Sequence, residues 1–178
     1  QWNVAADFAL RPSRLFDQPL SGRGKVDADA THVHDVDATL ALGRNTADLH
    51  GAFGKPGERL AWKVDGKQLS ALRGDQYGAV LASGVVTGTM QAPRTTFEVD
   101  ARGLGWVPRE RRNDNGSVHA SGEAWLSGSA GTRAVEVTAK GDMQRLNPAA
   151  FGSPLAGSIN GGFTASGRTG ANMGGAVD

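Results

Sequence analysis

The stretch Thr95–Arg102, with the sequence TTFEVDAR, alternates apolar and polar residues. Alternate side chains of a β-strand point to opposite faces, so this pattern predicts a strand with one apolar and one solvated side. The first set of residues that share a side is Thr95, Phe97, Val99 and Ala101, and the second is Thr96, Glu98, Asp100 and Arg102. The fold class follows from how often this pattern returns.

The same period of two recurs along the chain, at residues 26–30, 36–42, 60–65, 118–126, 135–140 and 159–165. Strands with one apolar face are typical of antiparallel sheets that leave one side in water. We expect only short helical turns, near Arg11–Phe16, Leu69–Asp75 and Leu146–Phe151. Turn residues separate the strands at Gly54–Gly57, Asn113–Gly116 and Gly128–Gly131. The sequence therefore predicts an all-β protein.

Composition narrows the function classes. The 178 residues carry a formal net charge of +1, and no basic stripe with interleaved aromatics offers a nucleic-acid groove. Cysteine is absent, which excludes disulfides, thiolate catalysis and cysteine-ligated metals. No secretory signal and no apolar run long enough to span a bilayer is present. We expect no nucleic-acid partner and no cofactor.

The apolar faces carry little bulk. They consist mainly of Val, Ala and Leu, and the chain has only 4 Trp, 6 Phe and 1 Tyr beside 26 Gly. A closed sandwich of this length would bury more aromatic volume. Both ends of the sequence also read as mid-strand. We therefore expect residues 1–178 to form one segment of an open sheet from a longer repeat protein, with degenerate repeats near 4–30, 60–106 and 135–168.

The run from Leu60 to Trp106 resembles the repeat of the TamB family, whose members are AsmA-like bridge-like lipid transfer proteins. The matching elements are Leu60–Val64, Leu69, Ala82–Gly84, Val86–Thr89, Pro93 and Gly103–Trp106. The segment Leu146–Phe151 is similar to the element that opens a module in this family, although Asn147 stands where an aspartate is expected. Ser13–Leu15 followed by Pro19–Gly22 resembles the same element.

The resemblance implies an elongated, curved antiparallel sheet that forms an open half-pipe, or β-taco, with an apolar concave face. It implies a periplasmic segment of a protein anchored in the inner membrane of a Gram-negative bacterium. The function implied is phospholipid transport between the two membranes, outer-membrane protein assembly (autotransporter secretion), or both. The implied partners are phospholipid acyl chains or unfolded strands of outer-membrane proteins, a TamA-like barrel, and neighbouring repeats of the same chain.

Small side chains on the apolar faces would leave room for acyl chains. The residues that we expect to line the hydrophobic groove are Val36, Leu40, Trp62, Val64, Phe97, Val99, Val118, Val135, Val137, Ile159 and Phe163.

Other motifs favour simpler interpretations. His32 and His34 share one side of a strand and could bind zinc with a third ligand, but a solvated polar face is the interpretation we adopt. The acidic pairs Asp27/Asp29 and Asp35/Asp37 lie on predicted wet faces rather than in a glycosidase-like site. The basic cluster Arg109–Arg112 fits an exposed loop. No nucleophile or phosphate-loop motif occurs, so we expect neither enzyme nor metal protein. The alternative is a closed β-sandwich that serves as a binding or spacer module.

Overall fold

The computed structural model describes residues 3–106, 115–128, 133–169 and 174–177. Its strands are β1 (Asn3–Ala9), β2 (Ser13–Leu15), β3 (Gln18–Asp29), β4 (Val33–Leu42), β5 (Asn45–Phe53), β6 (Leu60–Gly66), β7 (Tyr77–Thr89), β8 (Ala92–Gly105), β9 (Ser117–Ser127), β10 (Ala134–Leu146), β11 (Ile159–Arg168) and β12 (Gly174–Val177). Two short 3₁₀ turns, η1 (Leu69–Ala71) and η3 (Pro148–Phe151), are the helical elements of these ranges.

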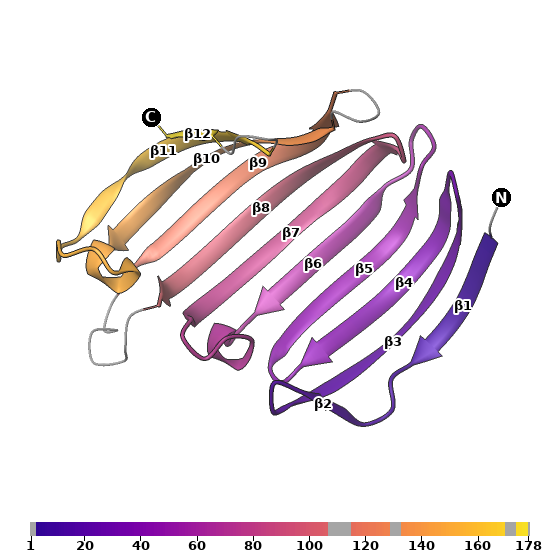
Figure 1. Cartoon of the computed structure of the whole chain (residues 1–178), viewed down its shortest axis with the longest axis horizontal. Coiled ribbons are helices and arrows are strands. Elements are labelled where there is room, and N and C mark those ends of the chain that lie inside the picture. The colour runs from indigo at the N-terminus through magenta and orange to yellow at the C-terminus, as the bar shows by residue number, and fades with distance from the viewer. Residues whose placement is uncertain (1–2, 107–114, 129–132, 170–173, 178) are drawn as a thin grey trace.

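All of these strands belong to one antiparallel sheet, in which each strand lies beside its neighbours in the chain (Figure 1). The order is β1-β3-β4-β5-β6-β7-β8-β9-β10-β11-β12, and β2 pairs with β3 off this path. The two ends of the path do not pair with each other. The all-β fold and the open sheet expected from the sequence are confirmed, and the closed sandwich is wrong for the described residues because no second sheet packs on the first.

The pairing register joins apolar residues into rows that run across the strands. Residues directly opposite each other in an antiparallel sheet share a face, so a row of partners defines one side of the sheet. Three rows are unbroken. The first is Phe8, Gly24, Ala38, Leu49, Trp62, Gly84, Phe97, Gly122, Ala139 and Ala165; the second is Ala6, Val26, Val36, Gly51, Leu60, Val86, Thr95, Ala124, Val137 and Gly167; the third is Gly22, Leu40, Ala47, Val64, Ala82, Val99, Ala120, Gly141 and Phe163.

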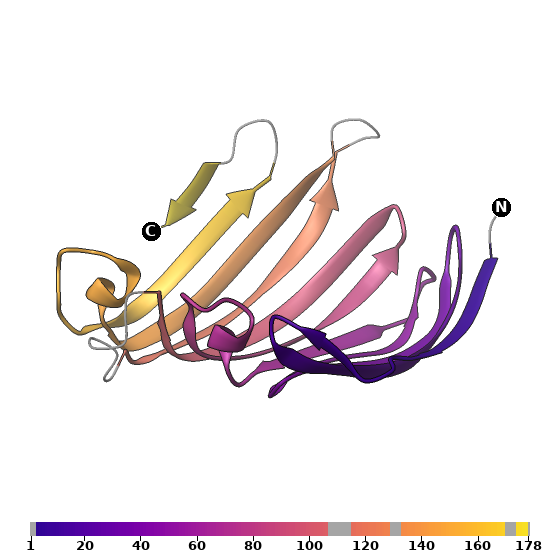
Figure 2. The same ribbon diagram turned by 60° about the horizontal axis from the view of Figure 1, so that its bottom comes forward.

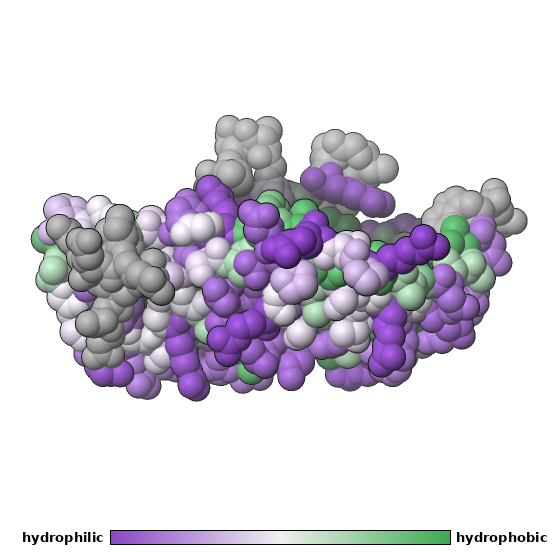
Figure 3. Space-filling view, turned by 90° about the horizontal axis from the view of Figure 1, so that it is seen from below, coloured by the Kyte–Doolittle hydropathy of each residue, from purple (hydrophilic) through white to green (hydrophobic). Residues whose placement is uncertain are grey.

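The sheet is bent toward the side that carries these rows, which we call the concave face. Figure 2 shows β1 at one end and β11 and β12 at the other standing above the middle of the sheet. Figure 3 views the molecule from below relative to Figure 1. Hydrophilic residues cover the outer side of the curved sheet, and hydrophobic residues gather inside its hollow. The opposite side, the convex face, carries the charged residues of the alternating pattern.

The surface area shows that the sheet is not folded onto a second layer. The chain exposes 11495 Å², whereas a compact monomer of its 18.5 kDa mass would expose about 8200 Å². No large side chain among the described residues is completely buried. The apolar face is therefore a surface and not the core of a closed domain.

Two asparagines anchor the loops that hold the 3₁₀ turns at one end of the strands. The buried Asn45 donates its side-chain amide to the Gln68 carbonyl at 3.0 Å and accepts the Gln68 N–H at 2.8 Å, just before η1. Asn115 accepts the Asn147 N–H at 2.9 Å in the same way before η3. Asn147 in turn accepts the Ala149 N–H, which caps that turn. A buried asparagine thus accepts the N–H of the residue that precedes each turn.

Two of the three expected helical turns are confirmed, and one is wrong. Those near Leu69–Asp75 and Leu146–Phe151 contain η1 and η3. The one near Arg11–Phe16 is wrong, because Ser13–Leu15 forms β2 and folds back on β3 through a turn at Phe16 and Asp17, both with positive φ. The expected turns at Asn113–Gly116 and Gly128–Gly131 and the Arg109–Arg112 cluster lie partly or wholly outside the described residues.

We expect Asn45→Ala to lower the free energy of unfolding by about 1–3 kcal/mol, because the substitution leaves the N–H and the carbonyl of Gln68 without partners. Urea denaturation followed by circular dichroism measures the change. The matched control is Asn3→Ala on the exposed edge strand β1, which should change it by no more than about 0.5 kcal/mol. Equal stability of the Asn45 variant and wild type would contradict the anchoring role.

Candidate hydrophobic groove

The concave face collects all the groove residues expected from the sequence. Eight of them are members of the three rows: Val36, Leu40, Trp62, Val64, Phe97, Val99, Val137 and Phe163. Val118, Val135 and Ile159 lie on the same face in β9, β10 and β11, outside the rows. Residues that are far apart in the sequence therefore form one continuous apolar surface.

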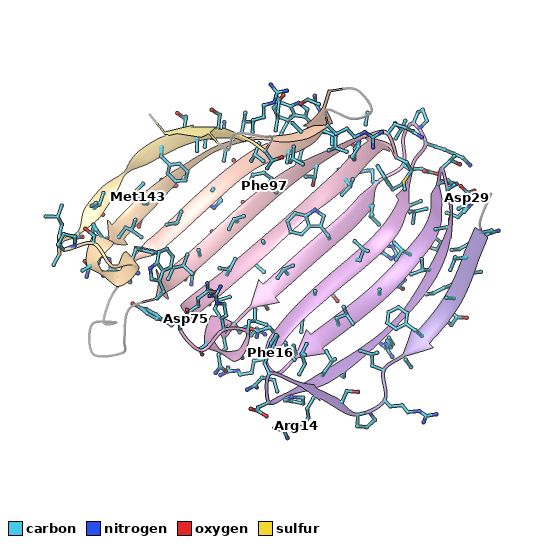
Figure 4. The ribbon with its side chains drawn as sticks, in the orientation of Figure 1. Arg14, Phe16, Asp29, Asp75, Phe97 and Met143 are labelled. Atoms are coloured by element: carbon cyan, nitrogen blue, oxygen red, sulfur yellow. The ribbon has the colours of Figure 1, made fainter. Side chains whose placement is uncertain are left out.

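This surface is accessible. Val64 is 41% exposed and Leu40 is 42% exposed, although both lie on strands in the interior of the sheet. In Figure 4, Phe97 lies over the middle of the sheet and Met143 toward its C-terminal side, whereas Arg14, Asp29 and Asp75 lie at the rims. The face is thus apolar across its floor and carries charge at the ends of its strands.

Four aromatic side chains of this face each lie opposite a glycine. The pairs are Phe8 with Gly24, Trp62 with Gly84, Phe97 with Gly122, and Phe163 with Gly141. In every pair a ring carbon lies within 2.6–2.9 Å of the place where the glycine would carry a Cβ. The rings therefore occupy space that exists only because the facing residue has no side chain.

Trp62 shows this arrangement most fully. Its ring lies over Gly84 in β7, and its indole Nε1 donates to Thr95 Oγ1 in β8 at 3.2 Å. The ring thus reaches across two strands and lies along the sheet. Thr95 is the only polar side chain in the three rows, which all fall within the described residues, and it satisfies the one polar atom that Trp62 brings to this face.

The convex face is lined by charged and hydroxyl side chains that pair across strands. Lys25 meets Asp35, Arg94 meets Glu123, and Arg168 meets Glu136 at N–O distances of 3.3, 3.2 and 3.8 Å. Exposed pairs of this kind contribute little to stability, about 0–1 kcal/mol each. Their main effect is to keep this side of the sheet in water.

A group of Glu98, Asp100 and His119 on the convex face is the one set of at least three potential metal ligands in the described part of the chain. His119 Nδ1 lies 3.0 Å from Asp100 Oδ1, and His119 Nε2 lies 3.8 Å from Glu98 Oε1. The hydrogen bond to Asp100 raises the pKa of His119, as do the charges of Glu98 and Asp142, against the opposing effect of desolvation. Ion pairing already accounts for this arrangement.

The histidine pair is placed differently from our expectation. His34 Nε2 lies 3.0 Å from Asp29 Oδ2 at the surface, but His32 is buried, and its Nε2 lies 2.7 Å from Glu58 Oε1. The solvated interpretation was therefore wrong for His32, because the loop between β5 and β6 brings Glu58 over it. Hydrogen bonds from the Lys55 N–H and from His32 outweigh desolvation and lower the pKa of Glu58. One member of each acidic pair takes part in a surface contact, Asp29 with His34 and Asp35 with Lys25.

Comparison with known proteins leaves the family open, because no family model, no curated protein and no solved structure matches the chain. Within the described residues, neither 3₁₀ turn has the length or hydropathy that crossing a membrane would require. Sequence reasoning missed the facing glycines, since their role depends on which residues lie opposite each other in neighbouring strands. The recurrence of Gly at positions of the apolar pattern was the available signal.

We expect His119→Gln to reduce thermal stability most at low pH. A pKa raised in the folded state means that the protonated histidine stabilises the fold below its unfolded pKa of about 6.5, and that this contribution disappears as the pH rises through the folded-state pKa. The difference in Tm between wild type and variant should therefore be larger at a pH of about 5.5 than at about 8.5. His50→Gln is the control, and a difference that does not depend on pH would contradict the assignment.

Proposed function

We propose that this chain is a periplasmic segment of a TamB-like protein and that its concave face is a hydrophobic groove for the acyl chains of phospholipids. The observation that supports this proposal best is the continuity of the three apolar rows across β1 to β11, with no second layer over them among the described residues. Large exposed apolar surfaces in a soluble protein mark sites where a ligand, lipid or partner binds.

Hydrocarbon fits this surface better than polypeptide does. A peptide backbone needs hydrogen-bond partners wherever it leaves water. In the three rows the only polar side chain is Thr95, which already accepts from Trp62, and the backbone groups of the interior strands are used by the sheet. Acyl chains make no such demand. The groove floor therefore favours lipid chains over the unfolded strands of outer-membrane proteins.

Polypeptide would find partners at the edges of the sheet instead. The described part of β1 pairs only with β3, so its outer N–H and carbonyl groups can receive another strand. This edge would suit neighbouring repeats of the same chain, or strands that are passed to a TamA-like barrel. We infer these partners, the inner-membrane anchor and the role in outer-membrane biogenesis from the family resemblance alone.

The competing function is a passive spacer in an elongated protein. A spacer needs the same stacked strands but gains nothing from an accessible apolar face, which would promote aggregation. The exposed fractions of Val64 and Leu40 therefore favour a groove that is used.

We expect phospholipid to accompany the folded chain when it is purified from bacterial periplasm without detergent. Native mass spectrometry detects the complex, and extraction into organic solvent identifies the lipid. The folded chain should also enhance the fluorescence of a hydrophobic dye, and added phospholipid should reduce that signal. A lipid-free chain that binds neither dye nor phospholipid would remove the groove.

A charge on the groove floor should stop binding and leave the fold intact. In Val64→Asp and Phe163→Asp the new carboxylate can stay hydrated in the empty groove, so the loss of stability should be about 1–2 kcal/mol. Binding of acyl chains should be lost, because hydrocarbon would have to displace water from an ionised group. Thermal melts and dye displacement measure the two effects.

The matched control for Phe163→Asp is Thr164→Asp, the next residue of β11, whose side chain points to the convex face opposite Lys140. This variant should bind lipid like wild type. If the two concave-face variants unfold while the control folds, the face is a dry core and the groove is wrong.

A further inference from the structure

The four ring–glycine pairs share one geometry although they come from different strands. Phe8 leans from β1 over Gly24 in β3, Trp62 from β6 over Gly84 in β7, and Phe97 from β8 over Gly122 in β9. Phe163 leans in the opposite direction along the chain, from β11 over Gly141 in β10. The recurrence at four separate places indicates that the ring–glycine pairs share a structural role.

A glycine opposite an aromatic residue allows the ring to lie down. With no Cβ on the facing residue, the ring can rest on the backbone of the neighbouring strand and cover it from water, as aromatic residues do when they rescue glycines in sheets. A ring that lies along the sheet raises the floor by only about 3.5 Å, the thickness of a carbon layer in contact. An upright ring would project much farther into the space above the floor.

We infer that the ring–glycine pairs set the clearance of the groove and so determine that it admits acyl chains. This inference rests on the proposed function, since it concerns the same surface. The rings supply apolar contact area. The facing glycines let the rings lie close to the sheet, so that an acyl chain can pass above them. The glycines at 24, 84, 122 and 141 are thus specificity-determining positions although they have no side chains.

The Trp62–Gly84 pair offers the clearest case. A Cβ on residue 84 would lie 2.6 Å from both Cε2 and Cζ2 of Trp62, so the ring would have to move. The backbone of the sheet fills the space beneath the indole ring. A displaced ring would therefore move away from the sheet and into the groove. The hydrogen bond from Trp62 Nε1 to Thr95, now 3.2 Å long, would be broken by the same movement.

The first experiment needs no ligand. In the wild-type chain, ring currents should move the Hα resonances of Gly24, Gly84, Gly122 and Gly141 upfield in an NMR spectrum, and those of Gly161 and Gly167 should stay in the ordinary range. Both control glycines lie on the concave face of β11 with nothing near their Cβ positions. Unshifted resonances at the four paired glycines would show that the rings do not lie on them and would overturn the inference.

The second experiment measures binding of spin-labelled stearic acid to three chains. Gly84→Ala should bind it at least about tenfold more weakly than wild type, because the raised indole obstructs the groove. The double variant Gly84→Ala with Trp62→Leu should recover affinity to within about threefold of wild type, because no ring remains to be raised. Gly161→Ala is the control and should bind normally.

The double variant separates obstruction from strain. A Cβ at residue 84 also approaches the Thr96 carbonyl oxygen, so Gly84→Ala can weaken the sheet itself. If strain causes the loss, removing the indole will not restore binding, and the inference is overturned. Should Gly84→Ala fail to fold, Gly24→Ala alone and with Phe8→Leu provides the same comparison. The nearest backbone atom there is Ala38 Cα at 2.9 Å, which lies farther from the Cβ position than the Thr96 carbonyl oxygen does at residue 84.

Failure of the proposed function gives a different result. If wild type and all variants fail to bind the fatty acid, the groove is not a lipid site, and the inference about its clearance falls with it even where ring currents place the rings on the glycines. If wild type and Gly84→Ala bind equally well, the groove stands and only the role of the ring–glycine pairs is wrong.

Discussion

The cross-strand register is the constraint on which the rest of this molecule depends. Because side chains alternate, a slip of one residue between any two strands would move charged side chains onto the concave face. The irregularities of pairing lie at Asp27/Ala28, Val33/Val36, Tyr77/Ala79 and Met143/Leu146. Of these residues only Val36 belongs to an apolar row, and it borders its irregularity from within the second row. The bulges shape the ends of the strands, while the interior keeps one register across the whole sheet. The continuous apolar floor is a consequence of that regularity.

The sequence alone could predict which residues lie on the apolar side of each strand, but not which residues of neighbouring strands lie opposite each other. Alternation is a local property, so Val36, Trp62, Val99 and the other groove residues could be assigned to the apolar side of their own strands. That the sheet is open could be predicted from the shortage of aromatic bulk. The glycine opposite each ring could not be predicted, because it depends on the register between strands. His32 was misplaced for a different reason, because Glu58 reaches it from a loop that is distant in sequence. A helical turn was expected near Arg11–Phe16, but Ser13–Leu15 pairs with β3 instead.

An open sheet must be stabilised without a closed core, and the structure shows what replaces it. The ladder of backbone hydrogen bonds connects every strand to its neighbours. Apolar side chains of the rows are covered to different extents, from Val36, which is 3% exposed, to Leu40, which is 42% exposed. Rings that lie on glycines protect the backbone where no side chain would do so. The loops at one end of the strands are fixed by the buried Asn45 and by Asn115. These contributions are distributed along the sheet, as in repeat proteins, where each unit is stabilised mainly by its neighbours.

The same architecture links stability to the proposed function. Apolar area that the fold leaves in water can still be buried by a ligand, at about 25 cal/mol per Å². Any ligand that binds the folded chain alone stabilises it in proportion to the logarithm of its concentration. A closed domain buries its apolar residues within itself and gains little from hydrocarbon. This sheet leaves a face of Val, Ala, Leu and seated aromatic rings uncovered, so acyl chains would complete a hydrophobic layer that the polypeptide itself provides only on one side.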